Sequence, residues 1–113
     1  MPLNELEKAV LEALLRKTPN ELHILERQLK EIDVSSRRNT GGGFYCKLEP
    51  NKIAEPSSAK FIGGVFADVE GLSHPMAFVL FIKEGFIDTL EGAATDENTA
   101  NIDFSNVRFE IIE

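Results

Sequence analysis

The sequence of 113 residues contains one cysteine, two histidines and no tryptophan. The single cysteine, Cys46, cannot form an internal disulfide, and with two histidines it cannot supply an all-Cys/His zinc site. The longest apolar run, Met76–Ile82, is far shorter than the ~18 residues that a membrane span needs. The first residues also lack the basic and then apolar order of a secretory signal. We therefore expect a protein of the reducing cytoplasm that uses no metal or cofactor and does not engage a membrane.

The composition is that of an ordinary folded domain, because 42% of the residues are hydrophobic and 27% are charged. A chain of this length buries roughly two-thirds of its unfolded surface, which is enough to fold without a disulfide. We expect residues 1–113 to form a single domain. Within it, residues 1–33 should form a helical pair and residues 43–112 an antiparallel sheet.

The net charge of −7 arises entirely in the last part of the chain. Residues 1–83 contain eleven acidic and eleven basic residues, whereas residues 84–113 contain eight acidic residues and one basic residue, Arg108. A surface of one sign repels nucleic-acid phosphates and attracts basic proteins. The acids therefore serve either solubility or the docking of a basic protein partner, and nucleic-acid binding is not expected. The candidate docking residues are Glu84, Asp88, Asp96, Glu97 and Asp103.

The first third of the chain predicts two helices. Asn4 and Glu7 have the spacing of a capping box, and apolar residues then recur at helical spacing through about Arg16. Thr18, followed by a proline and by Glu21, predicts the start of the second helix. The polar side of this second helix should carry Glu21, Arg27, Gln28 and Glu31.

The rest of the chain predicts a sheet. Residues 35–43 are polar and rich in glycine, which predicts a loop. Alternating apolar residues then predict about five strands, with a bulge at Gly63–Gly64 and a tight hairpin at Glu84–Gly85. The expected strands cover residues 44–48, 60–70, 76–82, 86–90 and 107–111. This order predicts an α+β fold in which both helices pack on one face of a meandering antiparallel sheet.

The strand Met76–Ile82 is apolar at successive positions, so both of its faces need a cover. Two helices on one side of the sheet cover only one face. A second copy of the chain is the simplest cover for the other face, which predicts a homodimer.

The three glycines Gly41–Gly43 suggest an anion site, because consecutive backbone amides can surround an anion. Known phosphate loops, however, follow a strand and open a helix, whereas these glycines precede a strand. A sharp turn into the sheet is the structural alternative. The candidate ligand-binding residues are Arg37, Arg38, Thr40, Gly41, Gly43 and Glu91.

The sequence indicates no catalytic residue. Cys46 with His23 or His74 would make a nucleophile and a base, but Cys46 is in phase with the apolar residues of its strand and should lie in the core. Asp88 and Glu91 are three residues apart, which places them on opposite faces of a strand and argues against a two-carboxylate site. A non-enzymatic role is favoured, although enzymatic activity stays open.

Two motifs carry a resemblance. Arg37–Phe44 reads R-x-x-T-G-x-G-F, and Phe78–Gly85 with Leu90–Gly92 reads F-V-L-F-x-x-x-G…L-E-G. Together they resemble a group of small, uncharacterised bacterial proteins over residues 35–92. Members often continue after L-E-G with an aromatic residue and a Gly/Glu-Trp-Pro stretch, where this chain has Ala93–Asn98. If that stretch contacts the partner, the resemblance implies that this chain binds a different one.

Three functions follow as alternatives. The first is a non-enzymatic bacterial binding protein, such as a toxin-immunity protein or an inhibitor, that docks through its acidic C-terminal surface. The second is a small-ligand or anion-binding domain or enzyme that uses Arg37, Arg38 and the glycine-rich turn. The third is a purely structural homodimer.

Overall fold

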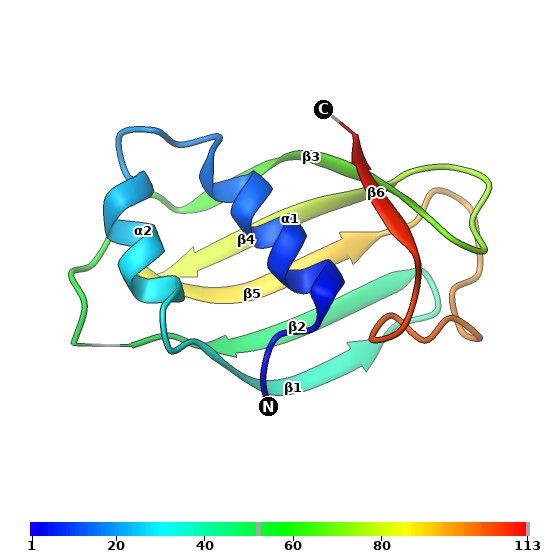
Figure 1. Ribbon diagram of the computed structural model, residues 1–113, viewed down its shortest axis with the longest axis horizontal. Helices are drawn as coiled ribbons and strands as arrows, with labels where there is room; N and C mark the ends of the chain where they lie inside the picture. The colour runs from blue at the N-terminus through cyan, green and yellow to red at the C-terminus, as the bar shows by residue number, and fades with distance from the viewer. Residues whose placement is uncertain (52, 113) are drawn as a thin grey trace.

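A computed structural model describes residues 1–51 and 53–112, and it places two helices on one face of a six-stranded antiparallel sheet (Figure 1). The α+β fold expected from the sequence is therefore confirmed. The helices are α1 (Glu5–Leu15) and α2 (Leu22–Leu29). The strands are β1 (Asp33–Asn39), β2 (Gly43–Glu49), β3 (Phe61–Val69), β4 (Met76–Lys83), β5 (Phe86–Ala93) and β6 (Phe109–Ile112). Within the described ranges, neither helix is long and apolar enough to cross a membrane.

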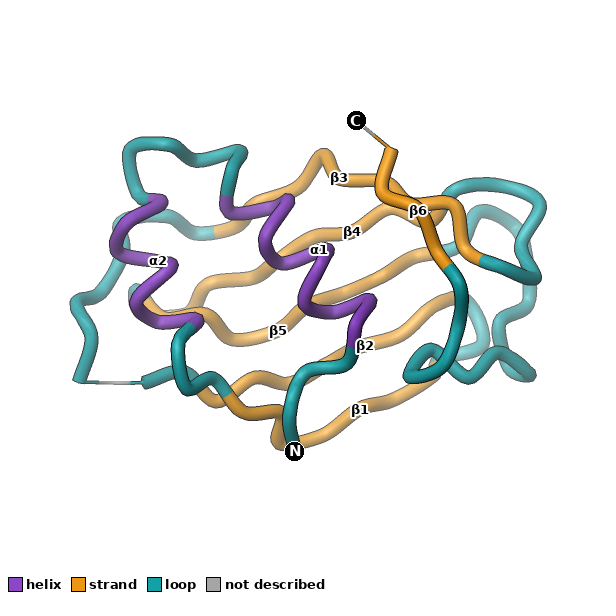
Figure 2. The backbone as a smooth tube through the Cα atoms, in the orientation of Figure 1, coloured by secondary structure: helices purple, strands orange, loops and turns teal. Residues whose placement is uncertain are grey.

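The strands lie in the order β1-β2-β5-β4-β3-β6 across the sheet (Figure 2). The pairs β1–β2, β3–β4 and β4–β5 form antiparallel hairpins, and two connections depart from a simple meander. The connection between β2 and β3 carries the chain past β5 and β4, and β6 then pairs with the far side of β3. This arrangement places β4 and β5 at the centre of the sheet, so the most apolar strand has neighbours on both sides.

Strand β1 occupies residues for which the sequence predicts a loop, so the sheet begins at Asp33 and not at residue 43. The prediction was wrong because β1 is an edge strand that pairs with β2 alone. Every residue of β1 except Val34 is exposed. Polar and charged residues are tolerated on such an edge, since only one side of the strand contributes to the core.

The start of α1 is as expected, and the start of α2 is not. The Asn4 side chain accepts a hydrogen bond from the Glu7 amide at 2.8 Å, and the Glu7 carboxylate accepts one from the Asn4 amide at 2.8 Å, which completes the capping box. Helix α2 begins at Leu22, several residues after the expected start. Thr18 does not cap it, because the Thr18 hydroxyl donates to the Leu15 carbonyl at the end of α1.

Gln28 is fully buried, although the sequence predicts it on the polar side of α2. Its Nε2 donates to the carbonyls of Glu55 and Gly85 at 2.9 and 2.8 Å, and its Oε1 accepts from the amide of Ile87 at 2.9 Å. Buried backbone groups need partners, and here a side chain supplies them. Gln28 thereby fixes α2 to the β4–β5 hairpin.

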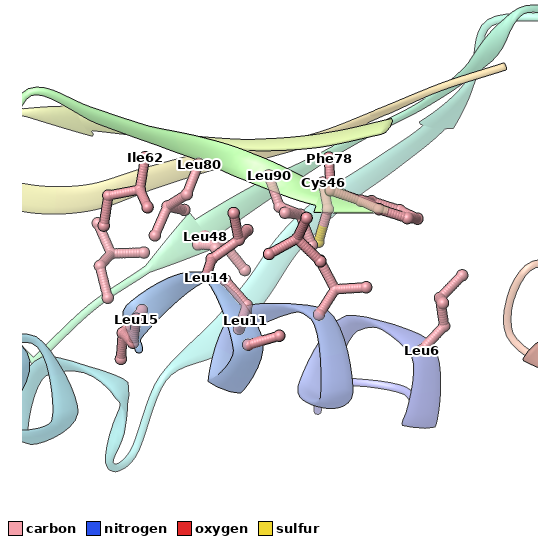
Figure 3. Close-up of a cluster of buried hydrophobic side chains, with 14 of the residues drawn as sticks. Leu6, Leu11, Leu14, Leu15, Cys46, Leu48, Ile62, Phe78, Leu80 and Leu90 are labelled. Carbon is pink, nitrogen blue, oxygen red and sulfur yellow. The ribbon is translucent and has the colours of Figure 1, made fainter. Parts of the chain in front are cut away.

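The main core lies between α1 and the sheet (Figure 3). Leucines of α1 point toward leucines of β2, β4 and β5, and Cys46 lies among them, as expected. Each fully buried leucine stabilises the fold by about 1.5–3 kcal/mol relative to an exposed one, so this layer is the principal source of stability. The leucines of this layer are Leu6, Leu11, Leu14, Leu15, Leu48, Leu80 and Leu90.

The two sequence motifs meet where β2 runs beside β5. Phe44 pairs with Gly92, and a Cβ on Gly43 would lie 1.9 Å from the Gly92 carbonyl oxygen, so the backbones approach too closely for any side chain there. The predicted bulge at Gly63–Gly64 and the two-residue turn at Glu84–Gly85 are both present. The motif glycines therefore have a structural role in bringing strands together.

Candidate functional site

Arg37 is bound within the fold. Its Nε and Nη2 donate to the two carboxylate oxygens of Glu7 at 2.7 and 2.8 Å, and Nη2 also donates to the Pro2 carbonyl at 2.7 Å. Glu7 is only 2% exposed. Burial opposes its ionisation, but hydrogen bonds from Arg37 and from the Asn4 amide outweigh burial and hold the pKa of Glu7 below 4.5. Arg37 therefore neutralises a buried carboxylate.

Cys46 lies beside this ion pair on the helix side of the sheet. Burial, with a further contribution from the Glu7 carboxylate, raises the pKa of Cys46 from 9.0 to about 12. Such a thiol scarcely ionises at neutral pH and is a poor nucleophile. His23 and His74 are exposed, whereas Cys46 is fully buried, so the structure does not bring the thiol together with either imidazole.

The amides of the glycine-rich turn are already occupied. Gly41–Gly43 donate in order to Asn39 Oδ1, Thr40 Oγ1 and Thr99 Oγ1, at 3.0, 3.3 and 3.0 Å. The turn therefore presents no free amide to an anion. Thr99, which the sequence analysis missed, is fully buried and ties the loop after β5 to this turn. A lone threonine in a polar loop has no periodicity that would have revealed it.

Arg38 and Glu91 lie on the other side of the sheet from Arg37. Arg38 pairs with Tyr45, and Tyr45 pairs with Glu91, so the three side chains form one row on the face that points away from the helices. The structure thus divides the expected ligand-binding set among three places. These are the helix side, the turn at Gly41–Gly43 and the opposite face.

The expected acidic docking residues do not share one surface. Glu84 lies in the β4–β5 hairpin, whereas Asp96, Glu97 and Asp103 follow the other end of β5. The eight residues of β5 separate these groups by about 25 Å. Glu97 accepts hydrogen bonds from the amides of Ser73 and the next residue, which lower its pKa, so it holds a turn in place.

In the part of the chain that the structure describes, no cluster of side chains could hold a metal ion.

Asp88 and Glu91 lie on the same side of the sheet, so the prediction that they face opposite ways was wrong. A bulge interrupts the pairing of β5 with β4, and Ile87 and Leu90 are consequently both buried although they are three residues apart. Asp88 then forms an ion pair with Lys47 at 2.7 Å on the side away from the helices.

The sheet face that points away from the helices carries no helix of the described chain, and we call it the open face (Figure 1). Over parts of β3, β4 and β6 and over the end of β5 its side chains are apolar. The exposed carboxylates of Asp68 and Glu110, which pair across β3 and β6, border this area on the same face. Phe61, Phe66 and Phe81 are 68%, 46% and 41% exposed there. Single exposed apolar residues are common, but a contiguous set on one face marks an interaction surface. We call this set the apolar half: Phe61, Phe66, Ala77, Val79, Phe81, Ala93 and Ile112.

The rest of the open face is polar. Over β1, β2 and the middle of β5 it carries Arg38, Tyr45, Lys47, Asp88 and Glu91. The face therefore has an apolar half beside a polar half of mixed charge.

A groove of about 590 Å³ lies between α1 and α2 on the opposite side of the molecule. Its floor includes Leu15, Leu22 and Leu29, and its rim carries lysines and glutamates. Because the rim has both signs of charge, it selects neither an anionic nor a cationic ligand.

No protein-family model matches the sequence, and no curated protein and no solved structure matches it either. The geometry of the open face is therefore the evidence that bears on function.

Proposed function

We propose that this chain is a non-enzymatic protein-binding protein and that it docks its partner through the apolar half of the open face. The observation that carries the proposal is the exposure of three phenylalanines on one sheet face, at 41–68%. Full burial of such a side chain stabilises by about 1.5–3 kcal/mol, so a partner that covers these rings gains roughly 1 kcal/mol from each.

The chemistry of the face indicates the kind of partner. None of the seven residues of the apolar half is charged, so the partner should present an apolar surface. The polar half beside it, with the Lys47–Asp88 ion pair, has the composition of an interface rim. Small-molecule sites are concave and mostly apolar, whereas the leucine-lined groove of this molecule lies on the other side, between the helices. Another polypeptide fits the open face better than a small ligand does.

Photocrosslinking in native cells tests the proposal. A benzophenone amino acid is placed at position 79, in the centre of the apolar half, and as a control at position 23, which is exposed on α2. We expect a covalent adduct with a polypeptide from position 79 and none from position 23. Phe61→Lys, a change at the edge of the same patch, should abolish the adduct.

The acidic docking mode expected from the sequence is tested in the same experiment. Asp96→Lys with Asp103→Lys reverses two exposed charges at the end of β5 and should leave the position-79 adduct unchanged. The absence of any adduct from position 79 would overturn the proposal. So would an adduct that disappears in the Asp96/Asp103 variant and persists in Phe61→Lys, because docking would then depend on the acids.

A further inference from the structure

We infer that the partner of the open face is a second copy of this chain, in a two-fold dimer with the sheets face to face and the helices outside. The inference rests on the proposed function and names its partner. It is argued from the sizes of the side chains in the apolar half, which match each other under a two-fold rotation.

The clearest row of the apolar half crosses four strands. The register places Ile112 of β6, Phe66 of β3, Ala77 of β4 and Ala93 of β5 side by side in that order. Two large side chains therefore stand next to two small ones, and the change falls between β3 and β4.

The next row has the reverse order. Gly63 of β3 lies against Val79 of β4, since a Cβ on Gly63 would be 3.8 Å from Val79 Cγ2. Here the small residue is on β3 and the large one on β4. In the last row Phe61 and Phe81 pair across the same two strands, and both are large.

A two-fold axis parallel to β3 and β4, and between them, exchanges these strands from one copy to the other. Phe66 then faces Ala77 of the second copy, Ile112 faces Ala93 and Val79 faces Gly63. Phe61 meets Phe81 as an aromatic pair. Sheets that pack face to face lie about 10 Å apart and interdigitate in this way. A two-fold interface requires a patch that is complementary to itself, and the apolar half meets that requirement.

The dimer should be weak and should tighten with salt. One row across four strands and two rows across two strands, with strands about 4.8 Å apart and rows about 6.6 Å apart, give a patch of roughly 250 Å² per copy, about a third of the ~800 Å² of a standard interface. Each copy also has a net charge of −7, so the copies repel at low ionic strength. A basic partner held by acidic residues would show the opposite salt dependence.

Sedimentation equilibrium of the purified full chain tests the inference. We expect the apparent mass to rise from 12.6 kDa toward twice that value with increasing micromolar concentration, and to rise further with added salt. Val79→Lys should abolish the rise. Ile53→Lys is the matched control, because Ile53 is 96% exposed in a loop outside the open face and its replacement should change nothing.

A size exchange tests the pairing itself. Phe66→Ala alone leaves a hole opposite Ala77 of the second copy, and Ala77→Phe alone makes two rings collide, so each should weaken the dimer by about tenfold. The double variant exchanges large and small within one row and should restore the wild-type affinity. Its composition equals that of the wild type, so restoration cannot come from greater hydrophobicity.

Three outcomes would overturn the inference: a wild-type chain that stays monomeric, a dimer that is indifferent to Val79→Lys, and a double variant as weak as the single ones. The crosslinking experiment separates this failure from that of the proposed function. A monomeric chain that still crosslinks to another polypeptide from position 79 refutes the dimer and supports the binding role. A monomeric chain with no adduct refutes both.

Discussion

Replacing Arg37 by alanine should destabilise the protein strongly, whereas the same replacement of its neighbour Arg38 should not. Arg37→Ala leaves the carboxylate of Glu7, which is 2% exposed, without its two hydrogen bonds from the guanidinium. Removing one partner of a buried ion pair costs about 3–5 kcal/mol, because the remaining charge is left uncompensated. The Arg37 side chain is 31% exposed, so water can partly replace it, and we expect about 3 kcal/mol.

Urea unfolding followed by circular dichroism measures this difference. With a slope of about 1.5 kcal/mol per molar urea, the midpoint of Arg37→Ala should fall by roughly 2 M. Arg38→Ala should change the free energy of unfolding by less than about 0.5 kcal/mol. Adding Glu7→Gln to Arg37→Ala should cost less than the two single effects combined, since a neutral amide needs no cation. Equal midpoints for Arg37→Ala and Arg38→Ala would refute the reasoning and make Arg37 a ligand-binding candidate again.

Three further predictions follow from the buried polar groups. The pKa of Glu7 is lowered in the folded state, so ionised Glu7 stabilises the fold above its ordinary pKa of 4.5. This stabilisation is lost as the pH falls through the lower folded pKa. Urea midpoints in that acidic range should therefore fall more steeply for the wild type than for Arg37→Ala. Gln28→Leu keeps the side-chain volume but removes the partner of the Ile87 amide and of the Glu55 carbonyl, while the Gly85 carbonyl keeps the Ser57 amide at 2.7 Å; thermal or urea unfolding should show a loss of about 2–4 kcal/mol. Cys46 is fully buried with its pKa raised to about 12, so a thiol reagent should modify it only after urea unfolds the chain; rapid modification of the native protein would contradict its placement.

Most of the fold could be predicted because most elements alternate between core and solvent. The strand around Cys46 and the helix after Asn4 both have a clear period, and the structure confirms both. Strand β1 has none, because it is an edge strand, and β2 is its one strand neighbour among the described residues. The start of α2 was misplaced because the Thr18 hydroxyl donates to the Leu15 carbonyl at the end of α1 and does not cap α2. Which of these two hydrogen bonds Thr18 makes depends on three-dimensional packing.

The sequence could not show which side chains of the candidate site find their partners far along the chain. Arg37 and Glu7 are thirty residues apart, and Gly43 and Thr99 are fifty-six apart. No spacing rule connects such positions. An arginine next to glycines therefore has the sequence of an anion site, although its guanidinium and the glycine amides are occupied within the fold.

Strand β4 is apolar on both faces, but within one chain only the face toward the helices is buried. Met76, Phe78 and Leu80 face the helices and are buried, whereas Val79 and its neighbours on the open face are left partly or largely exposed. Strand propensity explains why valine and phenylalanine occur there, but it does not explain why small residues alternate with large ones across β3 and β4. The same face is polar over β2, at positions such as Lys47, so an exposed strand of this sheet does not need apolar side chains. Alternating sizes have a physical use where another surface interdigitates with them, which is the argument for a second copy on the open face.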